Sequence, residues 1–300
     1  MALNRGWDYR ETVGAESAGR TLLDHLTATR THSTPAVWTD RLQRGELEVD
    51  DVRADGDVIL QAGHTVVWHR PPWDEPDVPL HFDILHEDDA VLAVVKPSGL
   101  PTMPAGGFLT HTLLTIVRAR VPEARPVHRL GRFTSGIVLF AKTGEAASAL
   151  SRAWREHGVE KRYRALASGV AATDSFEIDA AIGRVPHPTL GSVYAALAGA
   201  KPSHSRATVL QRRDDTTLFR VDITTGRPHQ IRIHLACAGH PLVGDPLYDV
   251  GGVVRAHAPG LPGDGGYLLH AERLAFAHPM TGAPTVLQAP APDALQCGQD

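Results

Sequence analysis

The segment of residues 127–142 constrains the fold more than any other part of the chain. Its first half is polar and reaches Gly131-Arg132, and its second half is an apolar run that ends in Ala141-Lys142. A short apolar run of this kind, bounded by turn-forming residues, predicts a strand over residues 136–141. Any fold for this chain must therefore place this strand in a sheet.

The part of the chain after residue 82 is predicted to be rich in strands. Helices are predicted over residues 109–120 and 145–157, and no alternation of strand and helix indicates parallel βαβ units. We therefore expect an α+β domain around a central mixed or antiparallel sheet. The predicted strands span residues 84–86, 91–95, 136–141, 163–168, 205–211, 217–223 and 231–234.

Four prolines between residues 70 and 79 mark a boundary in the chain, because proline prevents regular structure and stiffens a linker. Before this boundary we predict helices over residues 21–26 and from Pro35, with an N-cap in Ser33-Thr34, followed by strands over 44–49 and 63–68. The predicted organisation is a small module over 1–72, a linker over 73–81, a domain over 82–290 and a frayed tail over 291–300. A Gly/Pro-rich loop is predicted over 259–266.

Composition indicates a soluble globular enzyme, with 42% hydrophobic and 21% charged residues. No apolar stretch approaches the roughly 20 residues that span a bilayer, and the polar N-terminus does not resemble a signal peptide. The two cysteines, Cys237 and Cys297, provide neither a disulfide framework nor a metal quartet. We expect a cytoplasmic protein with no contact with a membrane.

The charges of the chain are segregated. A net charge of −4 disfavours nucleic-acid binding if the charge is spread evenly, but acidic residues cluster over residues 46–57 and basic residues over 118–164. A local basic surface matters more for phosphate contact than the total charge. Each of these arginines can also simply belong to a solvated helix face.

Five segments share the order and character of one set of known motifs. They are VKPSGLPTMP at 95–104, VHRLGRFTSGIVLFAK at 127–142, KRYRA at 161–165, TGRPHQIRIHL at 225–235 with GHPLVGD at 239–245, and LHA at 269–271 with FAHP at 276–279. Together they resemble the motifs of RluA-type RNA pseudouridine synthases. The N-terminal module resembles the S-four-like RNA-binding module found ahead of such domains.

The resemblance implies a pseudouridine synthase fold, an RNA partner (rRNA or tRNA), a monomer, and no cofactor or metal. It implies that Tyr163 stacks on the target base and that Arg232 lies beside the catalytic position, where the family has an aspartate and this chain has Gly131. Tyr163 as plain sheet core and Arg232 as a surface cation are the simpler alternatives. The substrate-binding residues implied by the motifs are His128, Arg129, Arg132, Thr134, Ser135, Arg227, His229 and Gln230.

Gly131 leaves three functions open. Isomerising uridine requires breaking the N1–C1′ bond, turning the uracil and rejoining it through C5, after the base has left its stack. In the family the aspartate acts at the sugar as nucleophile or base, and glycine has no side chain to do so. The chain is therefore a pseudouridine synthase acting on a structured RNA, an inactive RNA-binding pseudoenzyme, or an enzyme acting on a free nucleoside or on a different glycosidic bond.

Gly131 also leaves a buried Arg232 in need of another anion. A bound phosphate, Asp245 or Asp249 can supply it, and the glycine itself can answer a need for positive φ in a tight turn. Gly106-Gly107 fits either a phosphate site at a helix N-terminus or a turn. Convergence of several histidines would allow a metal site, although no His-Glu-x-x-His motif is present. The histidines concerned are His229, His234, His240, His270 and His278.

Overall fold

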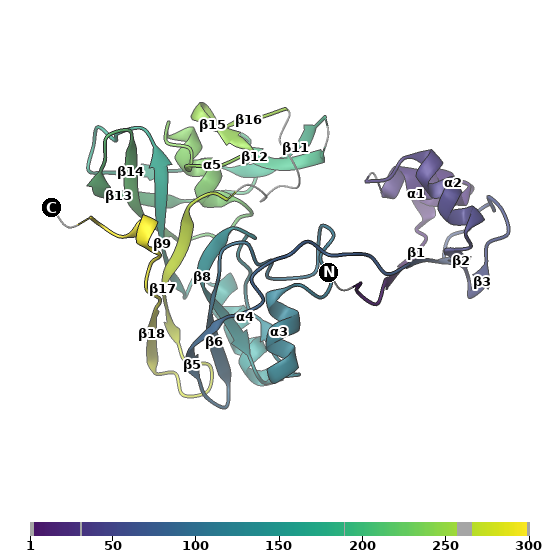
Figure 1. The fold of residues 1–300 in the computed structure, drawn as a ribbon, viewed down its shortest axis with the longest axis horizontal. Coiled ribbons are helices and arrows are strands. Elements are labelled where there is room, and N and C mark those ends of the chain that lie inside the picture. Colours follow the sequence, from purple (N-terminus) through teal and green to yellow (C-terminus); the bar gives the residue numbers. More distant parts are fainter. Residues whose placement is uncertain (1–2, 31, 189, 257–265, 299–300) are drawn as a thin grey trace. The chain divides into compact units, whose positions relative to one another are not determined.

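The structure is a computed structural model that describes residues 3–30, 32–188, 190–256 and 266–298 (Figure 1). The chain forms two compact units, Met1–Glu75 and Pro76–Asp300. Among the helices in these ranges, none has the length and apolar character that crossing a membrane requires. The predicted loop over 259–266 lies, apart from Gly266, outside the described residues.

The first unit is a small α+β module in which two helices cover a four-stranded sheet of order β1-β4-β2-β3. As predicted, the hydroxyl of Thr34 caps a helix that begins with Pro35. Trp38 on that helix is fully buried against Leu22 and Leu47. The elements are β1 (Trp7–Thr12), η1 (Ala15–Ser17), α1 (Leu22–Thr29), α2 (Pro35–Gln43), β2 (Leu47–Val49), β3 (Val52–Arg53) and β4 (Thr65–Arg70).

The second unit is built on a ten-stranded sheet whose main path runs β10-β13-β14-β9-β17-β8-β6-β5. Only β17 and β8 pair in parallel among the described strand pairs, so the sheet is mixed, as predicted. Its elements are β5 (Asp83–Glu87), β6 (Val91–Lys96), α3 (Leu113–Arg120), β7 (Arg125–Pro126), β8 (Thr134–Ala141), α4 (Gly144–Arg155), β9 (Glu160–Ser168), β10 (Ser175–Ile178), β11 (Ile182–His187), β12 (Gly191–Ala196), β13 (Ser205–Arg212), β14 (Thr216–Ile223), α5 (Gln230–Cys237), β15 (Tyr248–Asp249), η2 (Val250–Gly252), β16 (Val253–Val254), β17 (Leu269–Ala277), β18 (Pro284–Gln288) and η3 (Asp293–Leu295).

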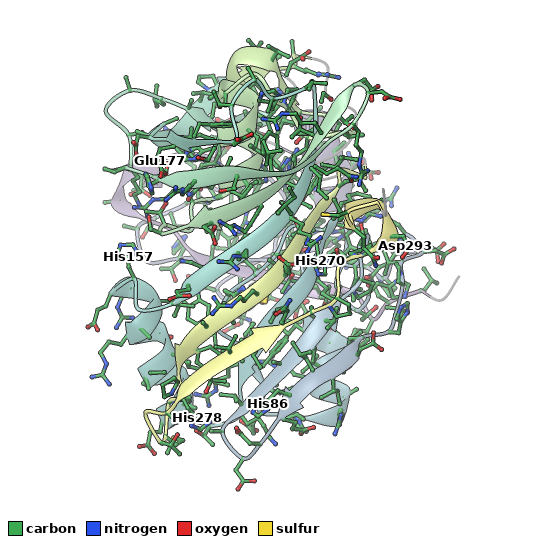
Figure 2. The ribbon with its side chains drawn as sticks, turned by 90° about the vertical axis from the view of Figure 1, so that its left-hand side faces the viewer. His86, His157, Glu177, His270, His278 and Asp293 are labelled. Carbon is green, nitrogen blue, oxygen red and sulfur yellow. The ribbon has the colours of Figure 1, made fainter. Side chains whose placement is uncertain are left out.

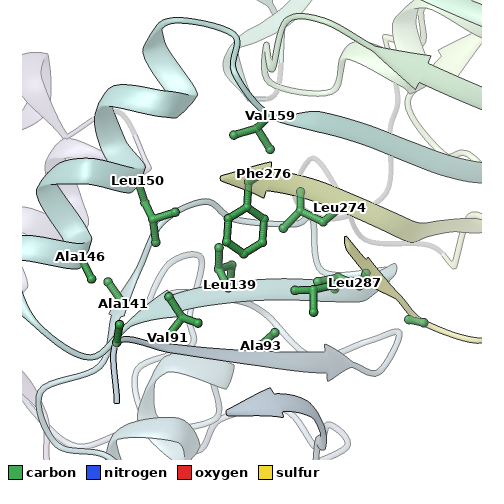
Figure 3. Close-up of a cluster of buried hydrophobic side chains, with 13 residues drawn as sticks. Val91, Ala93, Leu139, Ala141, Ala146, Leu150, Val159, Leu274, Phe276 and Leu287 are labelled. Carbon is green, nitrogen blue, oxygen red and sulfur yellow. The ribbon is translucent and has the colours of Figure 1, made fainter. Parts of the chain in front are cut away.

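Strand β8, predicted from the apolar run, is buried along its whole length. Alternate side chains of a strand point to opposite faces, and both faces are covered here. Leu139 and the other side chains on its face of β8 pack with Leu150 of α4 (Figure 3), whereas Val138, on the opposite face, packs with Leu113 of α3. A helix on each face explains why β8 shows no polar alternation.

The predicted strand over residues 231–234 is wrong, because this segment is helix α5. Every residue from Gln230 to Ala236 is buried, so the sequence shows no polar face, and periodicity cannot separate such a helix from a buried strand. Helix α3 begins at Leu113 with Thr112 as its N-cap. Gly106 and Gly107 therefore form a turn with positive φ, not the N-terminus of a helix.

Part of the predicted linker and part of the predicted tail are more ordered than the sequence indicates. In the predicted linker, Glu75 is 2% exposed and accepts a hydrogen bond from Asn4 of the first unit. The expectation of a frayed tail is wrong for residues 293–298. Leu295 is buried, and its carbonyl accepts from Arg164 of β9, because the segment closes one edge of the sheet's core.

Candidate active site

The motifs converge where β8, β9 and β17 lie side by side. Leu269 at the start of β17 is in register with Thr134 of β8 and with Ala165 of β9, and Ala271 is opposite Tyr163. The close approach of β17 to β8 requires Gly136, which has φ of +106° and whose Cβ, if present, would lie 2.3 Å from a backbone oxygen of Ala271. The starts of β8 and β17 and the middle of β9 thus meet beside the N-terminus of α5.

A cavity of about 560 Å³, counted to its open mouth, lies at this meeting point. Its walls come from the loop before β8, the middle of β9, the segment that leads into α5, and the start of β17. The lining residues are Arg129, Leu130, Gly131, Thr134, Tyr163, Ile223, Gly226, Arg227, His229, Gln230, Ile231, Arg232, Tyr267 and Leu269.

The structure brings eight of the eleven predicted site residues to this cavity. They are Arg129, Gly131, Thr134, Tyr163, Arg227, His229, Gln230 and Arg232. It does not bring His128, Arg132 or Ser135 there. Tyr163 is half-buried, and burial raises the pKa of its hydroxyl to about 12, so this ring is neutral at ordinary pH.

The three residues outside the cavity make contacts within the protein. His128 stacks on Trp154, its Nε2 accepts from the backbone N–H of Leu139, and burial lowers its pKa to about 4. The hydroxyl of Ser135 lies 2.9 Å from Nδ1 of buried His270. Arg132 donates to the carbonyl of Gly99, and its guanidinium lies 4.7 Å from the ring centroid of Phe108.

Asp245 is the anion that Arg232 needs. The guanidinium and the carboxylate form two hydrogen bonds of 2.7 Å, and both side chains are at most 2% exposed. Burial by itself would raise the pKa of Asp245, but the hydrogen bonds and charge of Arg232, with the N–H groups of Leu247 and Tyr248, hold it below its ordinary value. Asp249 instead forms a half-exposed pair with Arg255.

This pairing leaves one side of the guanidinium without a protein partner. Nη1 of Arg232 is buried and makes no hydrogen bond to any residue that the structure describes. A buried guanidinium N–H without an acceptor is costly. Since Arg232 lines the cavity, this N–H is suited to an acceptor oxygen of a bound ligand.

Side-chain hydrogen bonds fix the conformation of the segment before α5. The amide oxygen of Gln230 accepts from the hydroxyl of Thr225 and from the backbone N–H of Arg227. His229, with φ of +57°, has its pKa lowered to about 3 by burial and by Arg232. The hydroxyl of Tyr248 donates to a carbonyl, so it accepts from Nδ1–H of His229. These bonds fix the cavity wall before any ligand arrives.

Gly131 does not have a positive φ, so the turn explanation of this glycine is wrong. Its reason is steric: a Cβ here would lie 2.4 Å from the hydroxyl oxygen of Tyr267 and 3.4 Å from that of Thr134. Tyr267 is 2% exposed. Sequence reasoning missed it, although an aromatic residue two positions before the Leu269-His270-Ala271 motif was a usable signal.

Lys96 is a second residue that sequence reasoning did not assign to the site. It is fully buried at the end of β6, and its ammonium donates to the carbonyls of Pro97, Leu100 and Arg132 at 2.7–2.9 Å. Burial and the charge of Arg132 lower its pKa to about 7. Lys96 therefore ties the loop that carries Gly131 to the sheet.

The histidines considered for a metal site do not converge. His270 lies near the start of β17 and His278 directly after its end (Figure 2), where His278 and His86 both bind the carboxylate of Asp88. His234 lies on α5 outside the cavity lining, and its Nδ1 is 2.8 Å from the hydroxyl of Ser205. Within the described ranges, no group of three potential ligands is placed to hold a metal ion.

Comparison with known proteins assigns the family. The protein-family model described as RNA pseudouridylate synthase matches residues 90–237 of this chain. An uncharacterised RNA pseudouridine synthase of Synechocystis sp. is 42% identical over 91% of this chain and 95% of its own length. RNA pseudouridine synthase 5 of Oryza sativa is 36% identical over 99% of this chain and 90% of its own length. Ribosomal large subunit pseudouridine synthase D of Neisseria meningitidis is 39% identical over 72% of this chain and 59% of its own length.

Solved structures agree with this assignment. The human RNA pseudouridylate synthase domain containing 1 protein superposes with a TM-score of 0.56 at 27% identity, covering 74% of this chain and 89% of that one. The domain containing 4 protein, at 20% identity and a TM-score of 0.55, shares the fold. The chain belongs to the RNA pseudouridylate synthase family, and it is an isomerase of RluA/RluD type that acts on RNA.

Proposed function

We propose that this protein converts uridine to pseudouridine at an unstacked position of a structured RNA, with rRNA as the first candidate substrate. The observation that carries the proposal is the placement of Tyr163 and Arg232 in one cavity. The target base must leave its stack and enter a pocket. The Tyr163 ring offers it a flat surface, and the free Nη1–H of Arg232 offers a donor to a uracil carbonyl.

The rim of the cavity supports binding of a polyanion. Arg129 is exposed and Arg227 is half-buried, and both line the opening. Arginines at the mouth are placed to contact phosphates on either side of the target nucleotide, which is the contribution that makes binding sensitive to salt. The relative from Neisseria meningitidis named for the ribosomal large subunit favours rRNA over tRNA.

One feature of the cavity is the basis of the second candidate, an RNA-binding protein without catalysis. No aspartate or glutamate is among the described residues that line the cavity. Asp245 does not supply the missing acid, because its oxygens are occupied by Arg232 and by two backbone N–H groups.

The test is formation of pseudouridine in RNA from a strain that lacks the gene. Purified protein is incubated with this RNA, and pseudouridine is scored and mapped by mass spectrometry. We expect product at one or a few positions, and none with a Tyr163→Leu variant, which keeps an apolar side chain on β9 but removes the ring. Salt-sensitive RNA binding without product would favour the binding-only function. Absence of both would point to a free nucleoside.

A further inference from the structure

The space beside Gly131 is occupied by a hydroxyl from another segment. A Cβ at position 131 would lie 2.4 Å from Oη of Tyr267, and real Cβ atoms do not come that close to another atom. Position 131 and position 267 therefore compete for one volume at the cavity wall. In this chain a phenol reaches into that volume from the start of β17, and the side chain at 131 is absent.

The phenol is held firmly in this place. Its ring contacts Phe133 edge-to-face at 6.2 Å between centroids, and the guanidinium of Arg232 lies 4.4 Å from its ring centroid. Arg232 is itself fixed by Asp245. Because Tyr267 is 2% exposed, moving its ring would require repacking of these neighbours.

The hydroxyl retains capacity for a ligand. Among the described residues its hydrogen-bond partner is the hydroxyl of Thr134, at 3.3 Å. Each hydroxyl has one donor and two acceptor lone pairs, so this one long bond leaves most of that capacity unused. Tyr267 and Thr134 both line the cavity. They place a pair of hydroxyl groups beside the backbone of Gly131.

We propose that Tyr267, paired with Thr134, is a catalytic residue that hydrogen-bonds the ribose of the target uridine in the volume that a side chain at position 131 would otherwise fill. The proposal rests on the proposed function. It assigns to Tyr267 the task of holding the sugar while the N1–C1′ bond breaks, the uracil turns and C5 bonds to C1′, with the proton that C5 loses balanced by the one that N1 gains. It predicts that positions 131 and 267 are energetically coupled.

The first test is Tyr267→Phe, which keeps the ring and removes the hydroxyl. The single-turnover rate constant for pseudouridine formation is measured at saturating enzyme, together with the Kd for the same RNA and the Tm. We expect a rate about 100-fold lower, as for loss of one oriented hydrogen-bond donor in other enzymes, with the Kd within about twofold. A rate within twofold of wild type would overturn the proposal.

Two controls separate catalysis from stability and from the proposed function. Tyr248→Phe removes another buried phenol hydroxyl near Arg232, one that donates to the carbonyl of Tyr194, and its Tm gives the cost of such a loss to the fold. If the rate of Tyr267→Phe falls only in step with its Tm or its RNA affinity, Tyr267 belongs to the fold and the proposal fails. A wild-type protein that forms no pseudouridine contradicts the proposed function before any variant is compared.

The second test is a double-mutant cycle with Gly131→Asp. The single variant must displace the Tyr267 hydroxyl, so we expect a lower Tm. In Gly131→Asp/Tyr267→Phe the nearest remaining ring atom, Cζ, lies 3.8 Å from the new Cβ, which is ordinary contact. We therefore expect the double variant to regain most of the lost Tm. A Gly131→Asp variant as stable as wild type, or no recovery in the double variant, would refute the shared volume.

Discussion

Replacing Asp245 by asparagine tests the buried ion pair that holds Arg232 at the cavity. The two side chains are 2% and 1% exposed and share two 2.7 Å hydrogen bonds. Asparagine preserves the shape of the carboxylate but leaves the guanidinium charge uncompensated in the protein interior. Removing one partner of such a pair costs about 3–5 kcal/mol, which is a large part of the 5–15 kcal/mol that stabilises a typical domain.

The assay must report on the second unit. Four of the five tryptophans, at positions 7, 38, 68 and 73, belong to the first unit, so tryptophan fluorescence would mainly follow the wrong part of the chain. Hydrogen exchange of peptides that cover α5, measured by mass spectrometry, gives the opening free energy of the helix that carries Arg232. We expect this free energy to fall by about 3–5 kcal/mol in Asp245→Asn.

The matched control is Asp249→Asn, four residues along the chain. Asp249 pairs with Arg255 at 3.3 Å, and both side chains are about half exposed, so the same change should cost at most about 1 kcal/mol. If both variants lose less than about 1 kcal/mol, the ion pair does not hold α5 and the reasoning from burial is wrong.

Two further predictions concern the loop that carries Gly131 and the first unit. Lys96→Met removes the donor to three backbone carbonyls and should increase exchange in residues 97–100 and 130–133. Because the pKa of Lys96 is lowered from 10.5 to about 7, the folded chain binds fewer protons than the unfolded chain between these values. The free energy of unfolding of the wild type should therefore rise with pH from about 7 to 10.5, and this rise should be absent in Lys96→Met. If the two proteins show the same pH profile of stability, the lowered pKa does not belong to Lys96. Deleting residues 1–75, which have their own core, should leave a folded second unit with weaker RNA binding, measured by circular dichroism and filter binding. An unfolded product, or one that binds RNA as tightly as the full chain, would count against a separate RNA-binding module.

Local chemistry in the sequence was sufficient for much of the fold. The apolar run of β8, the Thr34-Pro35 helix start and the excess of strands over helices predicted an α+β domain around a mixed or antiparallel sheet, because strand and cap signals depend on near neighbours. The same signals failed for α5, whose residues are buried on all sides. They also failed for β1, an edge strand without buried side chains.

The site depended on distances that only the folded chain sets. The sequence identified Gly131, Tyr163 and Arg232 by their motifs, but it left open whether Asp245 or Asp249 would pair with Arg232. It did not show that the ring of Tyr267 fills the volume beside Gly131. Motif positions are properties of short segments. The partner of a buried charge and the occupant of an empty volume depend on which strands become neighbours, and here that is the pairing of β17 with β8 and β9.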